Sequence, residues 1–247
     1  MIAKIGIMSD THYGSLYDQP KNVEHFVKSC EEYGCEAILH CGDMIDGIKM
    51  RPYHDHEIYW HTLDEILDGV ETVLPDAGIP YYFITGNHDH SVFKVIGADF
   101  GRLLSERRKD VRYLGYSSGL VTLPGGIRAM LYHGNGGCGQ FHGTRLQKKA
   151  SYVAERMLSD GRPLPHIFAS GHCHTAIVKP NISGMFCLSV GCFQAPTPHL
   201  SSIGLVPEQI AFIVEYSTDD EFRIESLRYF KYHSTGAKSC TEYEMII

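Results

Sequence analysis

The sequence lacks the features that mark secreted, membrane-spanning and disulfide-stapled proteins. None of its 8 cysteines forms a C-x-x-C pair, and a chain of 247 residues needs no disulfide framework to fold, so we expect reduced thiols. No run of about 18 apolar residues occurs, and no basic segment followed by an apolar one opens the chain. We therefore expect a cytoplasmic protein without a membrane span or a secretory signal.

Positive charge is also scarce. The chain carries 22 Lys and Arg residues against 29 Asp and Glu residues, which gives a net charge of -7. A protein that grips long nucleic acid with its whole surface needs an excess of positive charge, so this class is disfavoured, although a local basic groove is compatible with the balance. Repeats, low-complexity tracts and linkers are absent too, and the 43% apolar composition can fill one core. We expect a single domain over residues 1–247.

Short apolar runs alternate with segments of helical periodicity over most of the chain. This alternation predicts an α/β fold, with buried strands and amphipathic helices in separate layers. Near the end of the chain, two alternating segments predict a β-hairpin with its turn at 217–220. The predicted strands are 2–8, 37–39, 81–84, 129–132, 167–169, 209–216 and 222–232, and the predicted helices are 21–34, 57–74 and 144–159.

Each of the first five predicted strands is followed by residues that commonly bind metal ions. Their oxygen and imidazole donors suit Mn, Fe, Zn, Co or Ni better than a thiolate-bound structural zinc. Two pairs have i, i+2 spacing, which would point both side chains of a pair to the same side of an extended chain. A lone histidine or aspartate is more often structural, but the ordered set predicts a metal site. The clusters are Asp10 with His12, Asp43, Asn87 with His88, His133, and His172 with His174.

Five motifs built on these clusters carry a resemblance to a known family. They are D-x-H at Asp10, G-D-x-x-D at Gly42, G-N-H-D at Gly86, H-G at His133 and G-H-x-H at Gly171. A single D-x-H or G-D is common, but all five in this order make the chain similar to the calcineurin-like metallophosphoesterases. The resemblance spans residues 10–174, and it implies a four-layer αββα sandwich of two mixed sheets flanked by helices.

The resemblance also implies two divalent metal ions, with Mn as the expected metal, bridged by Asp43 and by a water-derived hydroxide. Two divalent ions, two carboxylates and one hydroxide leave a formal charge of roughly +1, which attracts a phosphate group, and the ions lower the pKa of bound water. The expected reaction is therefore hydrolysis of a phosphoester. The first ion would be held by Asp10, His12, Asp43 and His174, and the second by Asp43, Asn87, His133 and His172.

Residues around these clusters have expected supporting or substrate-binding roles. His88 resembles the family's non-ligand histidine, which protonates the leaving oxygen or stabilises the transition state, with Asp89 as its orienting partner. Asp46 is expected to support a ligand rather than bind metal itself. Arg145 and His142, in and after the glycine-rich loop 134–143, are the expected substrate contacts. The histidines at 54–61 are expected to lie in a solvated loop rather than to form an extra metal site.

Departures from the protein-phosphatase pattern indicate the substrate class. Serine/threonine protein phosphatases typically continue G-D-x-x-D with Arg-Gly and use G-N-H-E, whereas here Gly47 follows Asp46 and Asp89 follows His88. We therefore predict a phosphodiesterase or nuclease that acts on a nucleotide or nucleic-acid phosphodiester. A phosphomonoesterase acting on a small molecule or a phosphoprotein is the alternative enzyme. A catalytically silent binding module is disfavoured because every ligand position is filled.

Overall fold

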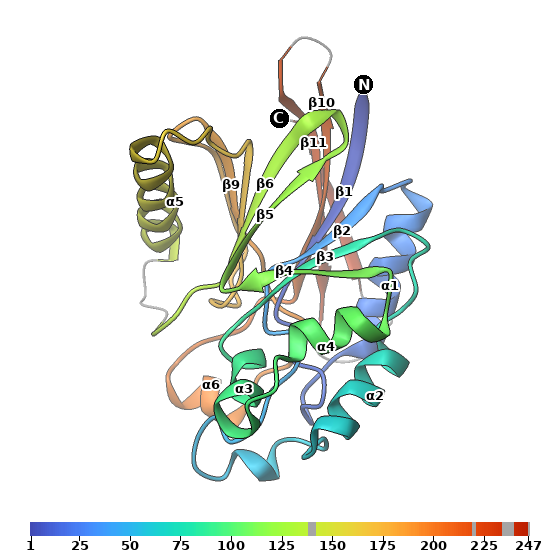
Figure 1. The fold of residues 1–247 in the computed structure, drawn as a ribbon. Helices are drawn as coiled ribbons and strands as arrows, with labels where there is room; N and C mark the ends of the chain where they lie inside the picture. Colours follow the sequence, from blue (N-terminus) through green and yellow to red (C-terminus); the bar gives the residue numbers. More distant parts are fainter. Residues whose placement is uncertain (138–141, 219–220, 234–239, 247) are drawn as a thin grey trace.

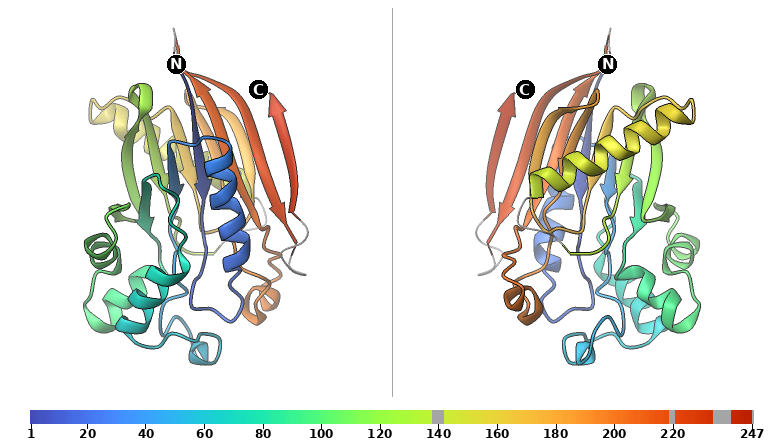
Figure 2. Two further views of the ribbon diagram at one scale, coloured as in Figure 1. Left: turned by 90° about the vertical axis from the view of Figure 1, so that its right-hand side faces the viewer. Right: turned by 90° about the vertical axis from the view of Figure 1, so that its left-hand side faces the viewer.

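Two β-sheets lie face to face, with helices on their outer faces, in the computed structural model (Figure 1, Figure 2). The structure describes residues 1–137, 142–218, 221–233 and 240–246. Each sheet contains both parallel and antiparallel neighbours. The architecture is therefore the predicted αββα sandwich of two mixed sheets.

Strand order places the first three strands of the chain side by side. Within the described residues, the first sheet has seven strands in the order β12 (Cys240–Ile246), β11 (Arg223–Tyr232), β10 (Ile210–Ser217), β1 (Ile2–Met8), β2 (Ala37–His40), β3 (Tyr81–Thr85) and β4 (Val111–Tyr116). The second has five in the order β5 (Ser118–Leu123), β6 (Ile127–Tyr132), β7 (Ile167–Ser170), β9 (Met185–Ser189) and β8 (Ile177–Ile182). The α-helices are α1 (Pro20–Glu32), α2 (Leu63–Val73), α3 (Asp89–Ile96), α4 (Phe100–Arg107), α5 (His142–Ser159) and α6 (Pro198–Ser202), and short 3-10 helices span His54–His56 and Pro124–Gly126.

Apolar side chains fill the space between the sheets and the spaces beneath the helices. In β1, Ile5 and Ile7 belong to the core between the sheets, whereas Met8 packs in the core beneath α1 and α2. This division follows from the alternation of side chains along a strand. On the outer face of the second sheet, Leu146 of α5 packs in one cluster with Phe168 of β7. Burial on both faces explains why the parallel strands are nearly continuous apolar runs in the sequence.

The start of α2 shows how a local cap sets a helix boundary. Thr62 Oγ1 accepts a hydrogen bond from the Glu65 backbone N–H at 3.3 Å, and the Glu65 carboxylate accepts one from the Thr62 backbone N–H at 3.0 Å. This reciprocal pair satisfies two backbone donors that would otherwise lack partners, and it starts the helix at Leu63. The prediction of helix over 57–62 is therefore wrong.

Several elements were not predicted from the sequence. The helices α3 and α4 are 8 residues each, which is too short to show a repeated helical pattern. The strands β4, β8 and β12 are mostly half-buried or exposed and lack an apolar run. The hairpin of β10 and β11 is confirmed, although residues 219–220 of its predicted turn lie outside the described residues. Across the described ranges, every helix is too short or too polar to cross a membrane.

Candidate metal centre

Parallel strands bring the predicted ligands to one edge of both sheets. The strands β1, β2 and β3 are parallel neighbours in the first sheet, and β6 and β7 are parallel neighbours in the second. Segments that follow parallel strands leave at the same edge of a sheet, where ligands commonly bind. The first sheet supplies Asp10, His12, Asp43 and Asn87, and the second supplies His133, His172 and His174.

Hydrogen bonds join the two sheets at this edge. The His172 backbone N–H donates to Asp10 Oδ2 at 2.9 Å, and the His133 ring donates from Nδ1 to the Cys41 carbonyl at 2.7 Å. These contacts connect residues from the loop after β7 to the loop after β1, and residues from the end of β6 to the end of β2. The candidate centre therefore lies at the seam between the sheets.

The predicted ligands leave their strands through tight turns and not as extended chain. The φ angle is 52° at Asp10, 46° at His12, 81° at His172 and 51° at His174. Since i, i+2 side chains share a side only in extended backbone, the predicted reason for their convergence is wrong, although the side chains do converge. Left-handed backbone is uncommon outside glycine and is strained. Positive φ angles occur at nine non-glycine residues of the described chain. Five of these are predicted ligands, namely the four residues above and Asp43.

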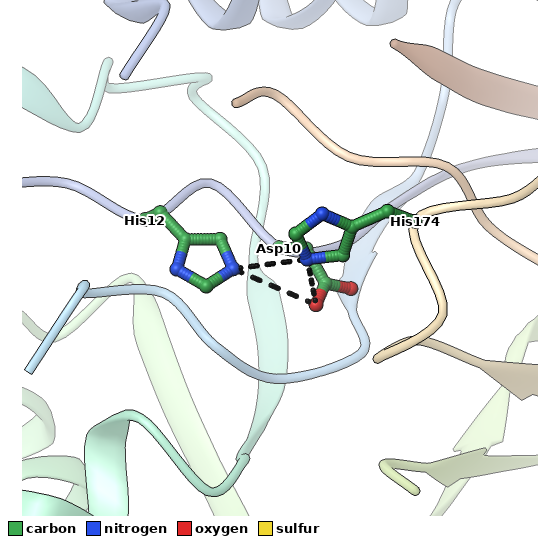
Figure 3. A group of neighbouring side chains, drawn as sticks. All are labelled: Asp10, His12 and His174. Atoms are coloured by element: carbon green, nitrogen blue, oxygen red, sulfur yellow. Dashed lines mark hydrogen bonds and ion pairs between the residues drawn. The ribbon is translucent and has the colours of Figure 1, made fainter. Parts of the chain in front are cut away.

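Asp10, His12 and His174 form the first group of converging donor atoms (Figure 3). His12 Nε2 and His174 Nε2 lie 3.1 Å apart, and they lie 3.8 Å and 3.2 Å, respectively, from Asp10 Oδ1. Donor atoms that each lie about 2.0–2.2 Å from one metal ion are roughly 3.0–3.5 Å apart. All three side chains are buried. Their spacing therefore fits a single divalent cation.

Asp43, His133 and His172 form the second group, with ligand atoms within 4.8 Å of one another. His133 Nε2 lies 3.0 Å from Asp43 Oδ2. Asn87 Oδ1 is buried as well, and it has no hydrogen-bond partner among the described residues. An unsatisfied buried polar atom costs about 1–3 kcal/mol, so folded proteins rarely leave one without a ligand. Asn87 Oδ1 and His133 Nε2 are good metal donors, and the residues therefore fit a second divalent cation.

Glycines at two motif positions allow the backbone to approach the carboxylates. A Cβ atom on Gly86 would lie 2.2 Å from Asp43 Oδ1, and a Cβ atom on Gly171 would lie 2.7 Å from Asp10 Oδ2. Such distances are shorter than van der Waals contact, so only glycine fits at these two positions. Asp43 Oδ1 also accepts the His88 backbone N–H at 2.8 Å, while Oδ2 faces His133. The turns thus hold both oxygens of Asp43 in fixed directions.

Asp46 lies behind His12 and holds its ring in place. His12 Nδ1 donates to Asp46 Oδ1 at 2.8 Å, which leaves Nε2 to face the other members of the first group. Asp46 Oδ2 accepts from His54 Nε2 at 3.2 Å, and Gln194 Nε2 donates to Oδ1 at 3.3 Å. Asp46 therefore fixes the tautomer and the orientation of a predicted ligand, which is how partners of metal-binding imidazoles act.

The roles of His54 and Gln194 were not indicated by the sequence. His54 is 1% exposed and does not lie in a solvated loop as predicted, whereas His56 and His61 are exposed. The His54 Nδ1 atom accepts the Met50 backbone N–H at 3.4 Å, so Nε2 is the donor to the Asp46 carboxylate. Gln194 follows β9 in a segment without any ligand motif, and no sequence pattern distinguishes it.

His88 is oriented by Asp46 and not by Asp89. His88 Nδ1 donates to the Asp46 backbone carbonyl at 2.6 Å, and Asp46 Oδ1 lies 3.4 Å from the same nitrogen. The Asp89 carboxylate instead accepts the backbone N–H groups of Ile45, at 3.0 Å, and Gly86, at 2.8 Å. Asp89 thus ties the G-D-x-x-D turn to the G-N-H-D turn, and the predicted partnership of Asp89 with His88 is wrong.

Arg145, one of the two predicted substrate contacts, lies beside the centre. Arg145 of α5 donates to the Asn135 carbonyl at 2.9 Å, and His172 Nε2 donates to the Gly136 carbonyl at 2.7 Å. Arg145 therefore holds the loop that also contacts a predicted ligand, and it is not among the residues that line the cleft at the centre. His142 is the first residue of α5, and its side chain lies outside the described part of the chain.

Burial and mutual contacts set the protonation of the centre. Burial raises the pKa of Asp10, but hydrogen bonds with its histidine neighbours outweigh this effect and hold the pKa well below its usual value. Burial lowers the pKa of His12, but Asp10 and Asp46 raise it to about 10. Burial also lowers the pKa of His133, but the neighbouring Asp43 carboxylate has the larger effect and raises it to about 9. Because metal-binding imidazoles must be neutral, metal binding here is coupled to proton release.

The centre opens into a cleft with a volume of about 540 Å³. This size falls within the roughly 300–1,000 Å³ typical of small-molecule sites. Besides the candidate ligands, the lining includes the basic residues Arg51 and Lys94 and the apolar residues Met50, Leu200 and Leu205. The cleft can therefore hold an organic group together with a phosphate.

One known protein family matches most of the sequence. The model described as the calcineurin-like phosphoesterase superfamily domain matches residues 3–208. The chain belongs to this superfamily. All five motifs of this calcineurin-like phosphoesterase fall inside the matched range, so the resemblance predicted from them is confirmed. The family and the buried Asp and His groups together indicate a metal-dependent phosphoester hydrolase with a dinuclear divalent metal site. No curated protein sequence matches the chain.

Solved structures with a similar fold include three of low sequence identity. Protein TM1076 of Thermotoga maritima has 15% identity and a TM-score of 0.41, with 90% of this chain and 97% of that chain covered. TT1561 of Thermus thermophilus has 12% identity and a TM-score of 0.47, with coverages of 79% and 92%. A dimetal phosphatase from Danio rerio has 13% identity and a TM-score of 0.47, with coverages of 97% and 98%. The family assignment depends on the sequence match and not on these likenesses.

Proposed function

We propose that this calcineurin-like phosphoesterase is a phosphodiesterase that hydrolyses a nucleotide or nucleic-acid phosphodiester, with two Mn²⁺ ions as cofactor. The observation that carries the proposal is the presence of two groups of converging donor atoms beside one cleft, with Asp43 as the proposed bridge. When bound, two divalent ions polarise the phosphoryl oxygens and lower the pKa of water. A donor set of oxygen and imidazole atoms without thiolates supports Mn²⁺.

His88 is placed to donate a proton to the leaving group. Its ring lines the cleft, and its centroid lies 4.5 Å from that of the His12 ring in an edge-on arrangement. Nδ1 must carry a hydrogen because its partner, the Asp46 carbonyl, can only accept. Asp46 Oδ1, 3.4 Å from the same Nδ1, helps to hold the ring in this orientation. We propose that the ring, when it carries a proton on Nε2 as well, gives that proton to the leaving oxygen.

Two features of the cleft support a diester over a monoester. Gly47 has a φ angle of 74°, and a Cβ atom there would lie 2.3 Å from the His88 carbonyl oxygen, so an arginine cannot follow Asp46. The arginine that does line the cleft, Arg51, forms an ion pair with Glu57. A monoester dianion needs more compensating charge than a diester, which carries a single negative charge. With Arg51 paired, Lys94 is the remaining Lys or Arg side chain among the lining residues, and its single charge matches that of a diester.

Hydrolysis by the Mn²⁺-loaded protein tests the substrate class. Bis(p-nitrophenyl) phosphate and p-nitrophenyl phosphate have the same leaving group, so the ratio of their kcat/KM values measures the preference for a diester. We expect the diester to be the better substrate. A higher kcat/KM for the monoester would contradict the proposal, and absence of turnover on both esters at saturating Mn²⁺ would favour a silent binding module.

The His88→Asn variant tests the proton donor. General acid catalysis contributes about 100-fold to 10,000-fold when the leaving group is a poor one. We therefore expect a loss of about 100-fold or more in kcat on thymidylyl-thymidine, whose alkoxide needs a proton, and a much smaller loss on bis(p-nitrophenyl) phosphate. The matched control is His56→Asn, because His56 is an exposed histidine on the nearby 3-10 helix. Equal losses on both esters, with metal content unchanged, would remove His88 from proton donation.

A further inference from the structure

An aromatic stack borders the candidate centre where β4 ends above α3 (Figure 1). The His90 ring lies nearly parallel to the Tyr116 ring, with centroids 4.1 Å apart and planes at 26°. It is also nearly parallel to the Phe93 ring, with centroids 5.4 Å apart and planes at 14°. Tyr116 ends β4 in register with Thr85, the last residue of β3, and Asn87 follows Thr85 by two positions. The stack therefore lies next to the turn that carries a predicted ligand.

The two outer rings of the stack are open to solvent. Tyr116 is 42% exposed and Phe93 is 51% exposed, although both rings are already held by contact with His90. A large aromatic side chain in water loses the stabilisation that burial would give. Because these rings are held in advance by a strand end and a helix, a ligand that stacks on them would lose little side-chain entropy in doing so. The stack is a preformed surface for a flat ring.

The same rings form part of the lining of a separate cavity with a volume of about 190 Å³. This volume is several times the roughly 30 Å³ that one water molecule occupies in the liquid. The acidic residues of its lining are Asp89 and Asp99, and no Lys or Arg side chain is among the lining residues. The Asp99 carboxylate repels an anion and no Lys or Arg side chain is there to bind one, so the cavity disfavours a phosphate and suits an uncharged part of a ligand.

We infer that the surface formed by Tyr116, His90 and Phe93 is a subsite for a nucleobase of the substrate, whose adjoining phosphodiester lies at the candidate metal centre. The inference rests on the proposed function, because it names where one organic group of that diester binds. The other organic group then faces the cleft beside Met50 and Leu200, which is lined by different residues. Stacking tolerates every base, since each has a flat π face, so the subsite selects nucleotides without selecting a sequence.

Two diesters with the same leaving group test the subsite. Thymidine 5′-(p-nitrophenyl phosphate) carries a base, whereas methyl p-nitrophenyl phosphate carries none. Stacking of a base on an aromatic side chain contributes roughly 1–3 kcal/mol, so Tyr116→Ala should lower kcat/KM for the thymidine ester by about 5-fold to 150-fold. The same variant should leave kcat/KM for the methyl ester unchanged, and Tyr116→Phe should keep the wild-type ratio.

The matched control is Tyr243→Ala. Tyr243 is 46% exposed and stacks on Tyr229 with centroids 4.7 Å apart, but it lies on the edge strand β12, which is separated from β1 by two strands. This variant should leave kcat/KM unchanged for both esters. Equal losses on both esters in Tyr116→Ala, or no loss on either, would overturn the subsite while leaving phosphodiester hydrolysis in place.

Binding separates failure of the subsite from failure of the proposed function. Titration of thymidine 5′-monophosphate and of inorganic phosphate into the Mn²⁺-loaded protein measures affinity without turnover. We expect the nucleotide to bind more tightly than phosphate. Tyr116→Ala should weaken the binding of the nucleotide by about 5-fold to 150-fold and leave the binding of phosphate unchanged. If neither diester is hydrolysed but this difference is found, the proposed function fails and the subsite stands. If the nucleotide binds no more tightly than phosphate, the subsite is refuted.

Discussion

Replacing Asp46 by Asn would remove the charge that holds His12 without removing any candidate ligand. The Asp46 carboxylate accepts hydrogen bonds from His12 Nδ1, His54 Nε2 and Gln194 Nε2. An asparagine has one oxygen and one NH2 group, so either the His12 or the His54 ring would meet a donor instead of an acceptor. A hydrogen bond to a charged group contributes about 1.5–3 kcal/mol, and loss of such a partner weakens metal binding by about 10-fold to 100-fold.

Isothermal titration of Mn²⁺ into the chelator-treated protein measures this effect. We expect Asp46→Asn to weaken Mn²⁺ binding at the site formed by Asp10, His12 and His174 by about 10-fold to 100-fold. Affinity at the other site should be nearly unchanged. The control is Asp110→Asn, because Asp110 forms a half-buried ion pair with Arg108 beside β4, away from the candidate ligands. Unchanged affinity at both sites would show that His12 keeps its orientation without Asp46, and equal weakening at both sites would show a general loss of structure. Either result would refute the reasoning.

Two further predictions concern protonation and backbone packing. The pKa values of His12 and His133 are raised to about 10 and about 9, so their stabilising contribution is complete below their ordinary pKa of about 6.5 and is lost as pH rises through 9 to 10. In EDTA the midpoint temperature of thermal unfolding should therefore decrease as the pH is raised from 7 to 10, while the affinity for Mn²⁺ should increase over the same range. A midpoint temperature in EDTA that increases with pH would contradict the assignment. Gly86→Ala would place a Cβ atom 2.2 Å from Asp43 Oδ1, so it should abolish measurable binding of at least one ion, whereas Gly143→Ala, with its nearest contact at 3.8 Å, should bind like wild type. Wild-type Mn²⁺ affinity in Gly86→Ala would exclude this close packing.

The candidate ligands could be predicted from the sequence because each motif is a short local unit. A buried strand, a tight turn and one or two ligand residues lie within a few positions of each other, and parallel pairing then brings the turns to one edge. The prediction needed the order of these units but not the path of the chain between them. It was right about convergence even though it assumed extended backbone where the structure has left-handed turns.

The residues that support the ligands could not be predicted in this way. Gln194 reaches Asp46 across 148 positions of sequence, and nothing around Gln194 marks it as a partner. Asp89 shows the opposite error, since it is adjacent to His88 in sequence but successive side chains at the start of a helix do not face each other. The partner of His88 is instead Asp46, which is 42 positions away. Such pairings depend on tertiary packing, which local pattern does not contain.

The position of the centre at the seam between the sheets has a consequence for the order of folding. Asp10 and His172 are 162 positions apart, and their contact joins the loop after β1 to the loop after β7. Closing so long a loop has a large entropic cost that early, local structure does not offset. We therefore expect the donor groups to assemble only after both sheets have formed and packed. Metal ions should then stabilise the native state without helping to reach it, so Mn²⁺ is expected to slow unfolding and to leave the folding rate unchanged.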